Sequence, residues 1–284
     1  MPALRRGQAV SRISEAGRSV SAKLLWVIIL PPHRLDRFAR HIVLPELGGA
    51  GQVALSKAHV VLIGCGGIGS PALQYLAAAG IGRLTLIDDD VVDASNLQRQ
   101  TIFSEADIGK RKAEAAAEWV AKFDPQIEAR AVVIRLGGEN AARVLGGGVT
   151  VVLDGCDNFA TRLAVSDACV ALGLPLTSAA VGRFQGQVGN FAGHLAAEPC
   201  YRCWVGDAFD ADDCDTCAVD GVLGAFVGLV GAFAAMSAIR VIVQGHAALG
   251  NPQWGQLQLF DGLAPSLRTI RVPKDADCKA CGSP

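Results

Sequence analysis

The 284-residue sequence has few aromatic residues and no marked excess of charge of either sign. Aromatic residues make up 6% of the chain, and the formal net charge is -1. The sequence therefore lacks the basic excess that predicts nucleic-acid binding and the acidic block that predicts a solvating tail. Because 51% of the residues are hydrophobic, the chain can bury one large core or two small ones.

Long uncharged runs are also scarce. Residues 221–239 (GVLGAFVGLVGAFAAMSAI) approach the length that spans a bilayer but lack aromatic belts, so we interpret them as a helix buried in a core. The charged residues within 1–34 are all basic apart from Glu15, and the segment contains the short apolar run LLWVIIL. No small-residue cleavage site follows that run, so we predict a disordered N-terminal extension rather than a targeting peptide.

Cysteine is the residue that stands out. Six of the nine cysteines form three CxxC pairs, which in a chain of this size indicate metal or thiol chemistry in a reducing cytoplasm rather than a disulfide scaffold. The first and last pairs, CYRC and CKAC, supply four thiolates, a closed set typical of structural zinc. The predicted zinc ligands are Cys200, Cys203, Cys278 and Cys281. Two redox pairs are the alternative interpretation.

Predicted strands and helices alternate as far as Gly186. Strands are expected in the stretches 57–63, 83–88, 127–134, 149–155 and 174–180, with helices in between. This order predicts an α/β fold with a Rossmann-like, doubly wound and mostly parallel sheet. Shorter strands follow, with the apolar helix and two late strands near 256–260 and 266–271. We expect one domain over 35–284, divided into a nucleotide-binding part (about 57–180) and a C-terminal antiparallel extension (about 181–284) tied by the zinc site.

A glycine turn lies between the first strand and the first helix. Gly64, Gly66 and Gly69 form GxGxxG, in which glycine permits a tight turn and a close approach of phosphate to backbone. Asp88 ends the next strand, where a carboxylate can accept both hydroxyls of a ribose. These features alone fit an NAD enzyme as well as any other nucleotide-binding protein.

The stretch DASNLQRQ (93–100) separates these interpretations. A dinucleotide would continue into a second βαβ half and needs no cation here, whereas a triphosphate needs cations at its β and γ groups. Arg99 and Lys112 can supply those charges, and Asp157 can hold Mg²⁺ between the phosphates. The alternative for Arg99 and Lys112 is a solvated helix face.

Several ordered motifs together resemble the HesA/MoeB/ThiF family. They are RFARHIVLPELGGAGQ, VLIGCGGIGS, DDDVVDASNLQRQTIF, DIGKRKAEAA, LDGCDNFATR, CYRC, CAVDGVLG and CKAC. The resemblance runs from about Arg37 to Cys281. Members of this family adenylate ubiquitin-like sulfur carriers and are simple relatives of the ubiquitin-activating enzymes.

The resemblance implies a role for each matching residue. Arg40 is similar to an arginine inserted into the active site from the other subunit of a homodimer. Cys217 matches a loop cysteine that in some relatives takes the carrier as a thioester or acyl disulfide, and Cys214 beside it is either a resolving thiol or inert. The implied ATP and Mg²⁺ contacts are Gly67, Asp88, Ser95, Asn96, Arg99, Lys112, Asp157 and Asn158.

The implied reaction is the adenylation of the C-terminal glycine carboxylate of a sulfur carrier ending in Gly-Gly, with release of pyrophosphate, in molybdopterin or thiamine biosynthesis. Because little sequence follows Cys281, we expect a separate sulfurtransferase or cysteine desulfurase as sulfur donor, and neither a nucleic-acid nor a membrane partner. Val219, Asp220, Gln185 and Ser166 depart from the family pattern, which leaves the carrier open. Two alternatives are an NAD(P)-dependent oxidoreductase and a non-catalytic, zinc-stabilised module that binds a ubiquitin-like protein.

Overall fold

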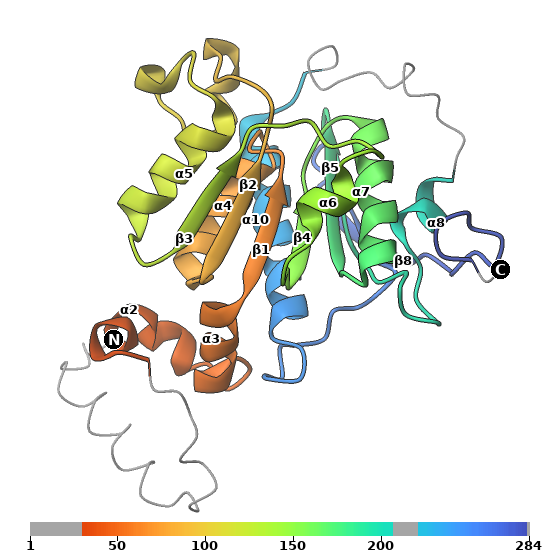
Figure 1. The fold of residues 1–284 in the computed structure, drawn as a ribbon, viewed down its shortest axis with the longest axis horizontal. Coiled ribbons are helices and arrows are strands. Elements are labelled where there is room, and N and C mark those ends of the chain that lie inside the picture. The colour runs from red at the N-terminus through yellow and green to blue at the C-terminus, as the bar shows by residue number, and fades with distance from the viewer. Residues whose placement is uncertain (1–29, 207–220, 283–284) are drawn as a thin grey trace, which may run out of the picture. The chain divides into compact units, whose positions relative to one another are not determined.

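The computed structural model describes residues 30–206 and 221–282 (Figure 1). The chain divides into two units between Arg37 and Phe38, within helix α2 (Pro32–Ile42). Helix α2 begins at Pro32, so residues 32–34, which we predicted to belong to a disordered extension, are helical. Cys214 and Cys217 lie outside the described residues, as do residues 1–29 of the extension. The α/β fold described below is that of the second unit.

A single eight-stranded sheet organises the second unit, in the order β3-β2-β1-β4-β5-β6-β7-β8. The first five strands of that order are parallel, and β6, β7 and β8 continue it antiparallel. This arrangement confirms the predicted fold class, with β6 longer than the short strand expected. The strands are β1 (His59–Ile63), β2 (Arg83–Ile87), β3 (Glu128–Val132), β4 (Val151–Asp154), β5 (Leu176–Gly182), β6 (Gln185–Phe191), β7 (Gln256–Asp261) and β8 (Ser266–Arg271).

Helices cover both faces of the parallel part of the sheet. Alternate side chains of β1 enter two separate cores, with Val60 and Leu62 in one and Val61 and Ile63 in the other. The first core includes α4, α5 and α10, and the second includes α6 and α7. The helices are α3 (Gly48–Lys57), α4 (Gly69–Ala79), α5 (Lys112–Phe123), α6 (Ala141–Leu145), α7 (Phe159–Leu172), α8 (Tyr201–Val205) and α10 (Gly224–Ile242), with short 3₁₀ turns η2 (Ala94–Asn96) and η3 (Glu105–Asp107).

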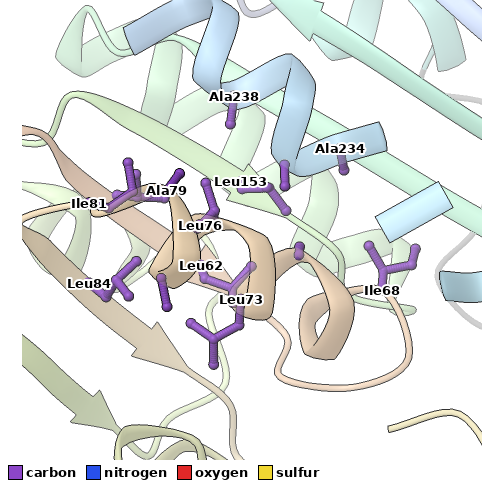
Figure 2. Packing of buried hydrophobic residues seen from close by; sticks show 14 of the residues in the cluster. Leu62, Ile68, Leu73, Leu76, Ala79, Ile81, Leu84, Leu153, Ala234 and Ala238 are labelled. Atoms are coloured by element: carbon purple, nitrogen blue, oxygen red, sulfur yellow. The ribbon is translucent and has the colours of Figure 1, made fainter. Parts of the chain in front are cut away.

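Helix α10 is the apolar segment of the sequence. It packs on α4 and the sheet, and Figure 2 shows its Ala234 and Ala238 in the same cluster as Leu76 of α4 and Leu153 of β4. By length and composition it could cross a membrane, but half of its apolar window is buried inside the protein. The expected burial is only partly correct, because Leu229 and Met236 on the opposite side are 52% and 39% exposed.

Candidate functional site

The glycine loop joins β1 to α4 and is shaped by two close approaches. Gly64 has φ 82°, and a Cβ on it would lie 3.1 Å from the backbone of Cys156. A Cβ on Gly69 would lie only 1.9 Å from the carbonyl oxygen of Gly64. Gly66 differs, because its Cβ would meet nothing nearer than Gln100 Nε2 at 3.5 Å. Gly64 and Gly69 therefore set the loop conformation, whereas a Cβ on Gly66 would make only an ordinary van der Waals contact.

A cavity of about 820 Å³ opens beside this loop at the carboxyl ends of the parallel strands, where open α/β sheets bind ligands. Its volume lies within the usual range for small-molecule sites. The predicted residues that line it are Gly64, Gly66, Gly67, Asp88, Asn96, Arg99, Lys112, Asp157 and Asn158. Gly69, Ser95 and Arg40 are not among its lining residues.

Asp88 lies at the end of β2 with its carboxylate held by backbone groups. Oδ2 accepts a hydrogen bond from the Cys65 amide at 2.7 Å, and Oδ1 accepts one from the Asp90 amide at 2.9 Å. Burial raises the pKa of Asp88 above 3.8, against the opposing effect of the Asp90 amide and the Lys112 charge. Each oxygen keeps a second acceptor site, so the carboxylate is fixed in orientation and still able to accept a ligand hydroxyl.

Two predicted cations reach the cavity from different elements. Lys112 begins α5, and its buried side chain places Nζ 2.9 Å from Asp90 Oδ2. Arg99 follows η2 and donates from Nη1 to the Ser95 carbonyl at 3.1 Å. Ser95 thus contributes a carbonyl that orients Arg99, while its side chain is exposed and does not line the cavity. Asp90 was not predicted from the sequence, although it belongs to the Asp88–Asp90 run.

The loop after β4 carries the predicted metal-binding aspartate. Asp157 is exposed and lines the cavity. Asn158 is the N-cap of α7, since its Oδ1 accepts the Thr161 amide at 2.9 Å. Asp154 is almost fully buried at the end of β4, and its Oδ1 accepts the Cys156 amide at 3.0 Å. The loop is therefore held at both ends while the Asp157 carboxylate stays accessible.

Arg162, a buried arginine on α7 that also lines the cavity, was not predicted from the sequence. Its guanidinium donates to the carbonyls of Cys156 and Ala179, the latter at 2.9 Å, and lies 3.8 Å from Asp154. The motif LDGCDNFATR contains this residue, but its burial depends on carbonyl groups from separate elements. Other cavity residues without a prediction include Gln100, Arg135, Tyr201 and Trp204.

The four predicted zinc ligands meet in one cluster. Their Sγ atoms all lie within 4.8 Å of one another, and the Cys200–Cys203, Cys200–Cys278 and Cys203–Cys281 pairs are 3.8, 3.6 and 3.4 Å apart. Tetrahedral Zn–S bonds of about 2.3 Å place sulfur atoms about 3.8 Å apart, so the donor set and its spacing fit zinc. The sulfur atoms are too far apart to be disulfide-bonded, and these cysteines are free.

Two of the four departures from the family pattern lie within the described residues. Gln185 is exposed at the start of β6, whereas Ser166 is buried in α7. Val219 and Asp220 lie outside the described residues, as does Cys217. Arg40 is exposed near the end of α2.

Comparison with known proteins places these features in a family. The ThiF family model matches residues 38–280. The chain is 39% identical to the sulfur carrier protein adenylyltransferase of Thermus thermophilus, with 87% of this chain and 91% of the relative covered. It is 43% identical to the adenylyltransferase and sulfurtransferase MOCS3 of Mus musculus over 87% of this chain, and it spans about half of that longer protein (52%).

Among solved structures, the microcin C7 biosynthetic enzyme MccB in complex with N-formylated MccA has the same fold, with a TM-score of 0.75 at 22% identity over 89% of this chain and 77% of that chain. The predicted adenylyltransferase class agrees with the names of the relatives. The match over nearly the whole second unit and the motif-based prediction agree: the chain belongs to the ThiF family.

Proposed function

We propose that this protein uses ATP to adenylate the C-terminal glycine carboxylate of a ubiquitin-like sulfur-carrier protein. One observation carries the proposal: a single cavity is lined by the glycine loop, a backbone-held acid (Asp88), two cations (Arg99 and Lys112) and an accessible acid (Asp157). The relatives named adenylyltransferases of sulfur carriers support the choice of substrate class.

In the proposed complex, Asp88 accepts hydrogen bonds from the ribose hydroxyls, and the backbone around Gly66 and Gly67 contacts phosphate. Arg99 and Lys112 neutralise the phosphate charge. Lys112 need not leave Asp90 to do so, because an ammonium group has three donors. Asn96 lines the same region and supplies an uncharged amide.

The carrier carboxylate is already ionised at neutral pH, so no general base is required. It attacks the α-phosphorus of ATP, a P–O bond forms, and the bond to the β-phosphate oxygen breaks with release of pyrophosphate. The protein contributes position and preorganised charge rather than covalent chemistry. Mg²⁺, when bound, would offset charge on the departing phosphates, and Asp157 is the residue we assign to hold it, since its carboxylate is exposed to the cavity.

A homodimer completes this proposal. Arg40 does not line the cavity of its own chain, so its predicted role requires delivery from a second copy. The exposed apolar side chains of Leu223 and Leu229, at the start of α10 and within it, support association of two copies.

Four reduced thiolates holding zinc fit a reducing cytoplasm. We assign about 57–180 to the nucleotide and about 181–284 to the carrier and zinc, with a separate protein as sulfur donor.

The oxidoreductase alternative is weaker for a topological reason. A dinucleotide fold extends its parallel sheet with a second mononucleotide-binding half. Here β6 returns antiparallel beside β5, and the sheet ends in the antiparallel strands β7 and β8. Arg99 and Lys112 would also have no role with NAD(P). The non-catalytic alternative predicts that nucleotide binds without turnover.

The proposal is tested with ATP labelled at the α-phosphate or at the γ-phosphate, in the presence of a carrier ending in Gly-Gly. Adenylation transfers the α label to the carrier and releases the γ label as pyrophosphate. Release of the γ label as inorganic phosphate, with no label on the carrier, would instead identify an ATPase. Titration with NAD in place of ATP serves as the specificity control.

A further inference from the structure

Helix α8 lies between the cysteine cluster and the cavity. Cys200 is its N-cap residue and Cys203 lies within it, while Tyr201, Trp204 and Val205 line the cavity. A helix of five residues is not stable alone and depends on tertiary contacts. A wall of the cavity is therefore built from the same short segment that supplies two of the four clustered thiols.

Two contacts tie α8 to α7. Arg202 forms an ion pair with Asp167, with Nη2 and Oδ2 2.6 Å apart. The buried side chain of Tyr201 lines the cavity beside Arg162, whose positive charge opposes the rise that burial gives to the pKa of Tyr201. The first contact is partly exposed, whereas the second leads into the buried network around Arg162.

Arg162 connects that network to the loop that carries Asp157. Its guanidinium donates to the Cys156 carbonyl, one residue before Asp157, and to the Ala179 carbonyl of β5 at 2.9 Å. It lies 3.8 Å from Asp154, whose Oδ1 holds the Cys156 amide at 3.0 Å. A planar guanidinium has a fixed set of donor directions, so a shift of one partner changes its fit to the others.

We infer that Tyr201 and Arg162 are positioning residues that couple the cysteine cluster to the nucleotide-binding cavity, so that metal bound by the four thiols and nucleotide bound in the cavity strengthen each other's binding. The coupling rests on the proposed function only in taking ATP as the ligand of the cavity. The path runs from Cys200 to Tyr201 along the chain, then through Arg162 to the carbonyl of Cys156. Neither positioning residue needs to contact the reacting atoms.

The test measures zinc affinity at equilibrium, by competition with a calibrated chelator, with and without a non-hydrolysable ATP analogue and Mg²⁺. Nucleotide is expected to tighten zinc binding by about fivefold or more in the native protein, at the lower end of usual coupling factors. Tyr201→Phe removes only the hydroxyl and should reduce this factor to near one. Tyr75→Phe is the matched control, because the sequence has two tyrosines and Tyr75 is exposed on α4.

Arg162→Lys is the second variant, since it retains the charge beside Asp154 but lacks the planar set of donors that reaches the carbonyls of both Cys156 and Ala179. It should also lose the coupling while still binding zinc. The inference is overturned if nucleotide leaves the zinc affinity of the native protein unchanged, or if Tyr201→Phe keeps the native coupling factor.

Failure of the proposed function gives a different result. A protein that binds the ATP analogue, shows the coupling and still labels no carrier would refute adenylation and leave the coupling in place. Absence of ATP binding by calorimetry in the native protein would overturn both.

Discussion

The same substitution should affect two different properties at Gly66 and Gly69: stability at Gly69 and ATP affinity at Gly66. In Gly69→Ala the new methyl carbon would lie 1.9 Å from the Gly64 carbonyl oxygen, a backbone atom that can move only if the loop moves. Overpacking of this kind costs about 1–3 kcal/mol, and the better helix propensity of alanine returns up to about 1 kcal/mol. We expect a net loss of about 1–2 kcal/mol, or roughly 2–8 °C in Tm for a domain of this size.

In Gly66→Ala the methyl carbon meets Gln100 Nε2 at 3.5 Å, an ordinary contact. Stability should therefore change by less than about 0.5 kcal/mol. Gly66 and its neighbour Gln100 both line the cavity, so the added methyl group lies at the cavity wall. ATP affinity should therefore fall at least about tenfold if phosphate contacts this backbone.

Thermal unfolding at fixed protein and zinc concentration and calorimetric titration with Mg²⁺-ATP measure the two effects separately. A Gly66→Ala protein that binds ATP normally would refute the assignment of this loop to phosphate. Native stability in Gly69→Ala would refute the steric reasoning. Gly49→Ala, at a helical glycine whose Cβ meets nothing within 4 Å, is the control for substitution itself.

Three further predictions concern the charged residues. Asp157→Ala should abolish carrier labelling while zinc content and Tm stay native; a variant with full activity would show that Asp157 is not the metal-binding residue. Mixing the Arg40→Ala and Lys112→Ala proteins, each inactive alone, should restore about one quarter of native activity. Random pairing makes half of the dimers mixed, and each mixed dimer has one intact site out of two. No recovery of activity would mean that Arg40 does not act across the dimer. Burial raises the pKa of Asp88, and the ionised carboxylate is the form that accepts both ribose hydroxyls. ATP affinity should therefore be constant near neutral pH and fall on acidification, starting at a higher pH than an exposed aspartate would give. Asp88→Asn should bind ATP weakly, with little pH dependence over that range.

The elements that the sequence predicted well are those whose signals are local. The apolar run before Gly64 predicted β1, and the spacing from Gly69 to Asp88 predicted the loop and β2. The strands were recognisable because a parallel strand buried on both faces has a continuous apolar run. The two CxxC pairs likewise predicted a cluster that the fold does assemble from segments far apart in the chain.

Features that depend on contacts between distant elements were not predictable in the same way. The reversal at β6 follows a two-residue turn in which Arg183 takes φ 52°. Arginine seldom adopts a positive φ, so the residue type does not predict this turn. The burial of Arg162 depends on carbonyl groups of the Cys156 loop and of β5. The exposed side of α10 is as apolar as its buried side, so hydropathy alone could not separate them.

The most direct test of the proposed function is ATP–pyrophosphate exchange with the zinc-loaded protein, with and without a panel of small carriers ending in Gly-Gly. We expect exchange that requires one of these carriers and is lost when the terminal glycine of that carrier is removed. Exchange that proceeds equally well without any carrier, or with the truncated carrier, would contradict adenylation of a carrier carboxylate.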